Sequence, residues 1–196
     1  PMGVVARRLN VAKGVLFNEM HRLAEILQPA ADGLLMLLRG AAVKQADETS
    51  WRTDGDNGYA WVFIAGRITL FVCEQTRSSS VPSAVLSDCI GKLMTDRYAA
   101  YNCFNGDRGY CLEHLKRETL KIVVDNPKSK ECLSFTTELV PWLGMAMSLR
   151  VDCAGDNVTY LLSAAFIRHK IEVIVEAPAR HPSVQRIQNI FRENAE

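Results

Sequence analysis

The sequence predicts an α/β protein: a helical segment, then a mixed five-stranded sheet with flanking helices, then an all-helical insertion. Three observations predict this class. Apolar residues recur at helical spacing between positions 16 and 38. From position 43 to 73, runs of aromatic and β-branched residues alternate with tight-turn signals. Beyond about position 125 the pattern becomes helical again.

The first segment is expected to be helical because its apolar residues share one face of a helix. These residues are Leu16, Met20, Leu23, Leu27, Leu34 and Leu38. Pro29 lacks a backbone donor and clashes with the preceding turn, so a kink or break is expected near Gln28. Gly40 is a plausible end of the helix.

Three strands joined by short turns are expected next. Turn-forming residues at 54–58 precede the run YAWVFIA at 59–65, and Gly66 with Arg67 separates it from ITLFVC at 68–73. With a first strand beginning near Val43, this order is an antiparallel meander.

A helix from about Ser80 to Ile90 is expected to lead into a short strand at 92–96 that ends in Asp96. A strand reached through a helix is naturally parallel to its neighbour. Residues 110–112 are a weaker fifth strand, followed by a helix at 113–124. Three antiparallel strands, a helix and a parallel strand are the order of a ribonuclease-H-like core.

The remaining chain is expected to form three helices: residues 132–149, residues 158–175, and a third beginning near Val184. The end of the second, at 171–175, equally fits a strand. The predicted domains are therefore an N-terminal helical segment (1–42), a partial catalytic core (43–124) and a helical insertion (125–196).

Two carboxylates fall where such a core would bring them together. Asp47 lies in the first strand region and Asp96 ends the fourth strand, and these strands are neighbours in this sheet type. Paired carboxylates suit Mg²⁺ or Mn²⁺, which take hard oxygen ligands and can activate an oxygen for attack on a phosphodiester. The ordinary alternative is turn chemistry at strand ends. Glu48 is expected to point to the opposite face from Asp47.

Composition limits the remaining possibilities. The net charge is +1, whereas a complete nucleic-acid-binding protein usually shows a clear basic excess. The six cysteines include no C-x-x-C pair, which argues against a zinc site of the usual spacing. No apolar run approaches the roughly 20 residues that span a membrane. The expected location is inside the cell, in the cytoplasm.

Several blocks resemble the insertion-sequence-66 family of DDE transposases. The run ADETSWR at 46–52, followed by GYAWVF at 58–63, resembles the first catalytic block, and TDRYAAYN at 95–102 resembles the second. The run CLEHLKR at 111–117 resembles a third block that usually reads CWAHLxR, with Leu-Glu in place of Trp-Ala. The helical stretch at 14–29 resembles the one that precedes the first Asp in the family.

The resemblance implies metal-dependent DNA cleavage and strand transfer, with Asp47 and Asp96 as the first two of three acidic residues and as ligands of Mg²⁺ or Mn²⁺. The third, a Glu, lies in the family within an Asn-Asn-x-Ala-Glu-Arg block, which this sequence lacks. The ending at 192–196 resembles that block only superficially. The expectation is a fragment truncated before the third acidic residue, inactive alone and without bound metal.

Further site candidates follow from these blocks. His114 is expected to contact the scissile phosphate or orient a catalytic group, or else to make a local hydrogen bond at a helix start. Arg52 and Arg97 are candidate phosphate contacts, since a guanidinium offers a bidentate fork, with surface solvation as the alternative. Tyr98 and Tyr101 are candidates for stacking on a base, with packing in the core and at its rim as the alternative.

Three functions are compared. The first is the DDE transposase core, acting on transposon ends and target DNA, with a homo-oligomer possible. The second is a non-catalytic transposase remnant that serves as a folded interaction or regulatory module. The third is another ribonuclease-H-like nuclease. Glu118, one turn after His114, is the nearest substitute for the third acid.

Overall fold

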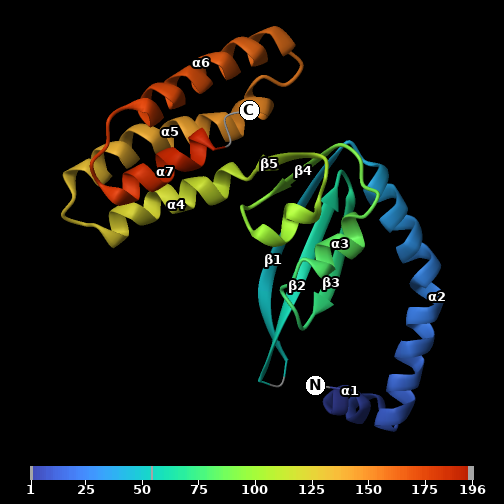
Figure 1. The fold of residues 1–196 in the computed structure, drawn as a ribbon. Helices are drawn as coiled ribbons and strands as arrows, with labels where there is room; N and C mark the ends of the chain where they lie inside the picture. The colour runs from blue at the N-terminus through green and yellow to red at the C-terminus, as the bar shows by residue number, and fades with distance from the viewer. Residues whose placement is uncertain (1, 54, 194–196) are drawn as a thin grey trace. The chain divides into compact units, whose positions relative to one another are not determined.

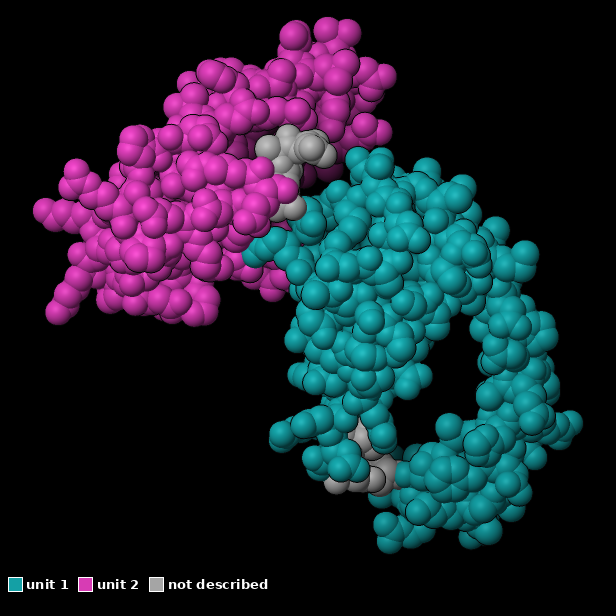
Figure 2. Space-filling model, in the orientation of Figure 1, with its two compact units in different colours: residues 1–110 teal, residues 111–196 magenta. Residues whose placement is uncertain are grey.

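The chain forms two compact units, residues Pro1–Tyr110 and Cys111–Glu196 (Figure 2). This is a computed structural model, and it describes residues 2–53 and 55–193. Position 54 of the expected turn and positions 194–196 of the chain end lie outside that range. The division into segments 1–42, 43–124 and 125–196 stays a prediction.

Two helices open the first unit, α1 (Met2–Leu9) and α2 (Lys13–Gly40). A break near Gln28 is ruled out, because α2 continues through Pro29, whereas a kink there stays a prediction. Proline removes one backbone hydrogen bond, and the residues around it are exposed, so water can satisfy the carbonyl that is left over. Near its end α2 joins the core through Leu38, which is fully buried.

Five strands form one mixed sheet in the order β3-β2-β1-β4-β5 (Figure 1). They are β1 (Val43–Thr53), β2 (Asp56–Ala65), β3 (Ile68–Glu74), β4 (Lys92–Thr95) and β5 (Asp107–Tyr110). The first three pair antiparallel, whereas β4 runs parallel to β1 and β5 parallel to β4. This order and these directions are those of a ribonuclease-H-like sheet, so the predicted fold class is confirmed.

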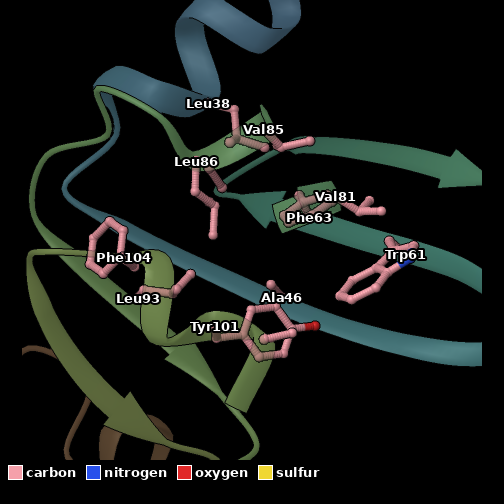
Figure 3. Close-up of a cluster of buried hydrophobic side chains, with 12 residues drawn as sticks. Leu38, Ala46, Trp61, Phe63, Val81, Val85, Leu86, Leu93, Tyr101 and Phe104 are labelled. Atoms are coloured by element: carbon pink, nitrogen blue, oxygen red, sulfur yellow. The ribbon is translucent and has the colours of Figure 1, made fainter. Parts of the chain in front are cut away.

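One face of the sheet carries the core of the first unit. Helix α3 (Ser80–Leu86) and the short 3₁₀ helix η1 (Ala99–Cys103) cover this face. Figure 3 shows the packed side chains, which include Trp61 and Tyr101. The buried residues are Leu38, Ala46, Trp61, Phe63, Ala65, Val81, Val85, Leu86, Leu93, Ala100, Tyr101 and Phe104. On the opposite face Gln45, Asp47 and Thr49 are exposed.

The fifth strand differs from its expected position. It was expected at 110–112 but forms at Asp107–Tyr110, and Cys111 instead caps the next helix. This strand pairs with β4 in parallel, with Gly109 opposite Met94. A short strand that is stabilised by pairing with its neighbour leaves little local signal in the sequence.

The second unit is a helical bundle. Its helices are α4 (Leu112–Asp125), α5 (Lys130–Asp152), α6 (Asn157–Glu176) and α7 (Pro182–Arg192). Residues 171–175 are helical, which decides between the two alternatives for that stretch. The bundle has its own core: Leu115, Ile122, Cys132, Phe135, Leu139, Leu143, Val184 and Ile187. Within the described residues, no helix combines the length and apolar character needed to cross a membrane.

Asp156 caps the start of α6, and this gives a pH-dependent prediction. Its carboxylate accepts hydrogen bonds from the Thr159 hydroxyl (2.6 Å) and the Thr159 amide (3.0 Å), and these bonds lower the pKa of Asp156. A lowered pKa stabilises the fold above the ordinary Asp range, near pH 4, and this stabilisation is lost as the pH falls through the folded-state value. Asp156→Ala should therefore lower the unfolding midpoint at pH 7, and the difference from wild type should shrink in acid. Parallel pH curves for the two proteins would contradict this, and Glu172→Ala in the middle of α6 is the control.

Candidate active site

The two predicted metal ligands lie on neighbouring strands. Asp47 is within β1, and Asp96 directly follows the last residue of β4. The parallel ladder pairs Val43 with Lys92 and Gln45 with Met94. The ladder ends there, but the same register continued by two residues would set Asp47 opposite Asp96. Since adjacent strands lie about 4.8 Å apart, we expect the two positions to be close to each other.

Strand alternation orients these two positions. Ala46 and Thr95, each one residue earlier, are 6% and 1% exposed and lie on the core side. Because successive side chains alternate, the next residues face the opposite side of the sheet. Asp47 is accordingly exposed, and Asp96 is half-buried.

Local hydrogen bonds hold each carboxylate. Asp47 Oδ1 accepts from the Glu48 amide at 2.9 Å, and Asp96 Oδ1 accepts from the Tyr98 amide at 2.9 Å. The second bond spans two residues, as in an Asx turn, and fixes the chain as it leaves β4. The Thr95 hydroxyl donates to the Asp96 carbonyl at 2.6 Å, which further restrains this corner.

A third carboxylate, Glu48, lies on the core side, as its alternation with Asp47 predicts. Its side chain is only 2% exposed, and it accepts hydrogen bonds from Arg77 and from the Tyr101 hydroxyl. Burial, followed by the bond to Glu48, raises the pKa of Tyr101. The charges of Glu48, Asp96 and Asp47 raise this pKa further, so all three carboxylates lie within electrostatic reach of one hydroxyl.

Sequence analysis did not identify Arg77. The available signal was Glu48 itself, because a carboxylate on a buried strand face needs a charged or hydrogen-bonding partner. The sequence offers no way to choose that partner, which lies 29 residues away in the connection between β3 and α3.

The three residues predicted to contact nucleic acid lie in different surroundings. Arg97 directly follows Asp96 and is half-buried. Tyr98 donates its hydroxyl to the Arg77 carbonyl at 2.6 Å, and the Arg77 guanidinium lies 4.0 Å from the centre of its ring, so one ring face is already occupied. Arg52 is exposed near the end of β1 and donates to Asn57 at 3.2 Å. Five residues of strand separate Arg52 from Asp47, roughly 16 Å.

His114 belongs to the second unit, in the first turn of α4, where it is half-buried. Glu118, one turn later, pairs with Arg186 at 3.2 Å, which gives this carboxylate a structural partner within the same unit. Asp47, Asp96 and Arg97 belong to the first unit, and their convergence on one site stays a prediction. A joint role of His114 with the two aspartates stays a prediction.

The donor chemistry of the two aspartates fits a hard divalent cation. Mg²⁺ is commonly held by one or two carboxylates, with waters and substrate phosphates completing its shell. Across positions 2–53 and 55–193, no cluster of three or more His, Cys, Asp or Glu residues is arranged to hold a metal ion. A site formed by Asp47 and Asp96 would have two carboxylates, and their role as metal ligands stays a prediction.

Solved structures with a similar arrangement are distant. The simian T-cell lymphotropic virus intasome in complex with PP2A regulatory subunit B56 gamma shares 15% identity at TM-score 0.32, over 50% of this chain and 47% of that one. The chain thus spans about half the length of this neighbour. The HTLV-2 integrase catalytic core domain in complex with magnesium also matches. Its dimeric form shares 15% identity at TM-score 0.31, over 43% of this chain and 73% of that one. Its trimeric form shares 12% identity at TM-score 0.32, over 76% of this chain and 97% of that one.

At these TM-scores the fold assignment rests on strand order and direction, not on the neighbours. Among curated proteins, no match was found. The model of the Transposase IS66 family matches residues 4–143, which span the whole sheet and both aspartates. Since that match covers well over half of the sequence, the chain belongs to the IS66 family of transposases.

Proposed function

We propose that this chain supplies Asp47 and Asp96 as two of the three acidic residues of a DDE transposase that cleaves and joins DNA. The observation that supports the proposal is the parallel register of β1 and β4, which, if continued by two residues, pairs Asp47 with Asp96. Family membership provides the class of chemistry, DNA transposition.

In this proposal Asp47 and Asp96 hold Mg²⁺ or Mn²⁺ through oxygen donors, as these ions prefer. The bound cation would supply Lewis-acid activation of the attacking oxygen and charge neutralisation at the phosphodiester. The two carboxylates repel each other, so cation binding also relieves that repulsion. The Tyr98 amide keeps the Asp96 carboxylate oriented while it does so.

DNA is the proposed partner, as transposon end and as target. Arg97 is the residue we favour for contacting a phosphate, because it adjoins Asp96 and a guanidinium matches phosphate geometry. Arg52, farther along β1, would reach a more distant part of the backbone. A homo-oligomer stays a prediction.

We further propose that these 196 residues alone do not transfer strands. The family resemblance implies a third acidic residue in an Asn-Asn-x-Ala-Glu-Arg block, and no such block is present in this sequence. Two carboxylates bind a cation, but they leave its position less constrained than three would.

The test is a titration of the chain with Mn²⁺, in which binding is measured as the loss of the electron paramagnetic resonance signal of the free ion. Wild type should bind Mn²⁺ saturably, and Asp47→Asn or Asp96→Asn should weaken binding by at least about 100-fold, because removal of a direct ligand exceeds the effect of removing a supporting group. Glu74→Gln, an exposed carboxylate at the end of β3, is the matched control and should bind as wild type does.

Two results would count against the proposal. One is Mn²⁺ affinity that is the same in wild type and in both aspartate variants. The other is the absence of saturable binding in wild type, which would favour the non-catalytic interaction module.

A further inference from the structure

We propose that Glu48, Arg77 and Tyr101 form a positioning clamp that fixes Asp47 and Asp96 relative to each other from the far side of the sheet. The role of the clamp rests on the proposed function, but its contacts can be tested without metal. Its members touch neither cation nor DNA in this proposal, so they are positioning residues.

The centre of the clamp is the buried carboxylate of Glu48. Arg77 donates to Glu48 Oε1 through Nη2 at 2.6 Å and Nε at 3.1 Å, and Tyr101 donates to Oε2 at 2.6 Å. Both oxygens are thus held by donors from different parts of the chain, and one of the donors is charged. Such charge-assisted bonds are shorter and stronger than neutral ones and fix orientation.

The clamp connects to Asp96 through Tyr98. The Tyr98 hydroxyl donates to the Arg77 carbonyl, the Arg77 guanidinium lies over the Tyr98 ring, and the Tyr98 amide donates to Asp96. In addition, Tyr98 and Tyr101 pack edge to face at 6.3 Å. Arg77 therefore restrains the segment that leaves β4 as well as the strand that carries Glu48.

The clamp connects to Asp47 through the backbone. Glu48 is the next residue along β1, and its amide donates to Asp47 Oδ1 at 2.9 Å. Fixing the Glu48 side chain therefore fixes the amide that orients the Asp47 carboxylate. The contacts run from one aspartate to the other through three segments that are far apart in the sequence.

Burying the charged side chain of Glu48 at this position costs desolvation free energy. Glu48 pairs with Trp61 across β1 and β2, and Trp61 packs edge to face on Tyr101 at 5.9 Å, so an apolar side chain would suit the surroundings (Figure 3). Replacing a whole buried ion pair by apolar residues is often neutral or stabilising, so stability alone does not account for the pair of Glu48 with Arg77. The need to orient the carboxylates of Asp47 and Asp96 does account for it, since a metal site tolerates displacements of its ligands of only about 0.5 Å.

The experiment measures the clamp in two ways on the whole chain. Glu48→Leu removes the carboxylate, Tyr101→Phe removes one donor, and Glu48→Gln conserves shape and an acceptor for Arg77. The first readout is hydrogen exchange of the Tyr98 amide, which bonds to Asp96. The second is the Mn²⁺ dissociation constant. Tyr59→Phe, a half-buried tyrosine of β2, is the control.

We expect Glu48→Leu and Tyr101→Phe to speed exchange of the Tyr98 amide by about 10-fold, the equivalent of one lost hydrogen bond, while the amides of β2 and β3 keep wild-type rates. Mn²⁺ affinity should fall by roughly 10- to 100-fold, as for other groups that support metal ligands. Glu48→Gln should recover most of both losses.

Unchanged Tyr98 exchange in Glu48→Leu would overturn the clamp, and so would a uniform rise in exchange across the sheet, which indicates general destabilisation. If wild type binds no Mn²⁺, the proposed function fails while the exchange result still decides on the clamp. If Mn²⁺ binds equally to wild type and to Glu48→Leu, the clamp fails while the proposed function stands.

Discussion

Replacing Gly91 by alanine will destabilise the first unit by about 3 kcal/mol or more, the cost of a strained backbone combined with a steric clash. Gly91 has φ +81°, and a Cβ at this position would lie 2.2 Å from the carbonyl oxygen of Ala42. The same carbonyl accepts the Lys92 amide at 2.8 Å, where β4 begins to pair with β1. Alanine would therefore force apart β1 and β4, the two strands whose register underlies the proposed site.

Urea unfolding of Gly91→Ala and wild type will measure this cost. The matched control is Gly66→Ala, because Gly66 also has a positive φ, +58°, but a Cβ added to it would meet nothing within 4 Å. That variant should lose only about 1–2 kcal/mol of stability, the cost of placing a residue with a Cβ in the left-handed conformation. An equal loss in both variants would show that the approach of Gly91 to Ala42 is not tight. Mn²⁺ affinity should fall in Gly91→Ala alone.

Leu139→Ala will destabilise the helical unit by about 2–5 kcal/mol, the usual cost of a cavity left by leucine. Leu139 lies on α5, is fully buried and belongs to the bundle core. Thermal unfolding monitored by the fluorescence of Trp142, on the same helix, will report this loss.

Leu133→Ala is the comparison on α5, since Leu133 is 55% exposed. It should change stability by no more than about 0.5 kcal/mol, as is usual for surface substitutions. Similar losses for the two leucines would contradict the assignment of a separate core to the bundle. The first unit, with Trp51 and Trp61, should unfold as in wild type in both variants.

The strands with strong local signals were predictable from the sequence. Alternation and turn residues located the meander, and the apolar run before Asp96 located β4, because these signals depend on residues close together in the chain. The weak strand β5 was misplaced, since its position depends on pairing with β4, which lies apart from it in the sequence. The continuity of α2 through Pro29 was missed because proline weakens a helix locally without preventing it.

At the site, the sequence predicted which strands carry Asp47 and Asp96 and that Glu48 points away from Asp47. The partners of Glu48 were not predictable, because Arg77 and Tyr101 lie 29 and 53 residues from it along the chain. Long-range pairs of this kind are selected by tertiary packing, and a single sequence carries no record of the choice.

The two sides of β1 are chemically unlike at neighbouring positions, with an exposed Asp47 and a buried Glu48. Sliding this strand by a single residue would move Asp47 to the buried face and Glu48 to the exposed face. The side chain of aspartate is one methylene shorter than that of glutamate, so it would not reach Arg77 and Tyr101 as Glu48 does. A chain paired in this shifted register would bury a carboxylate without its donors, which disfavours the shift.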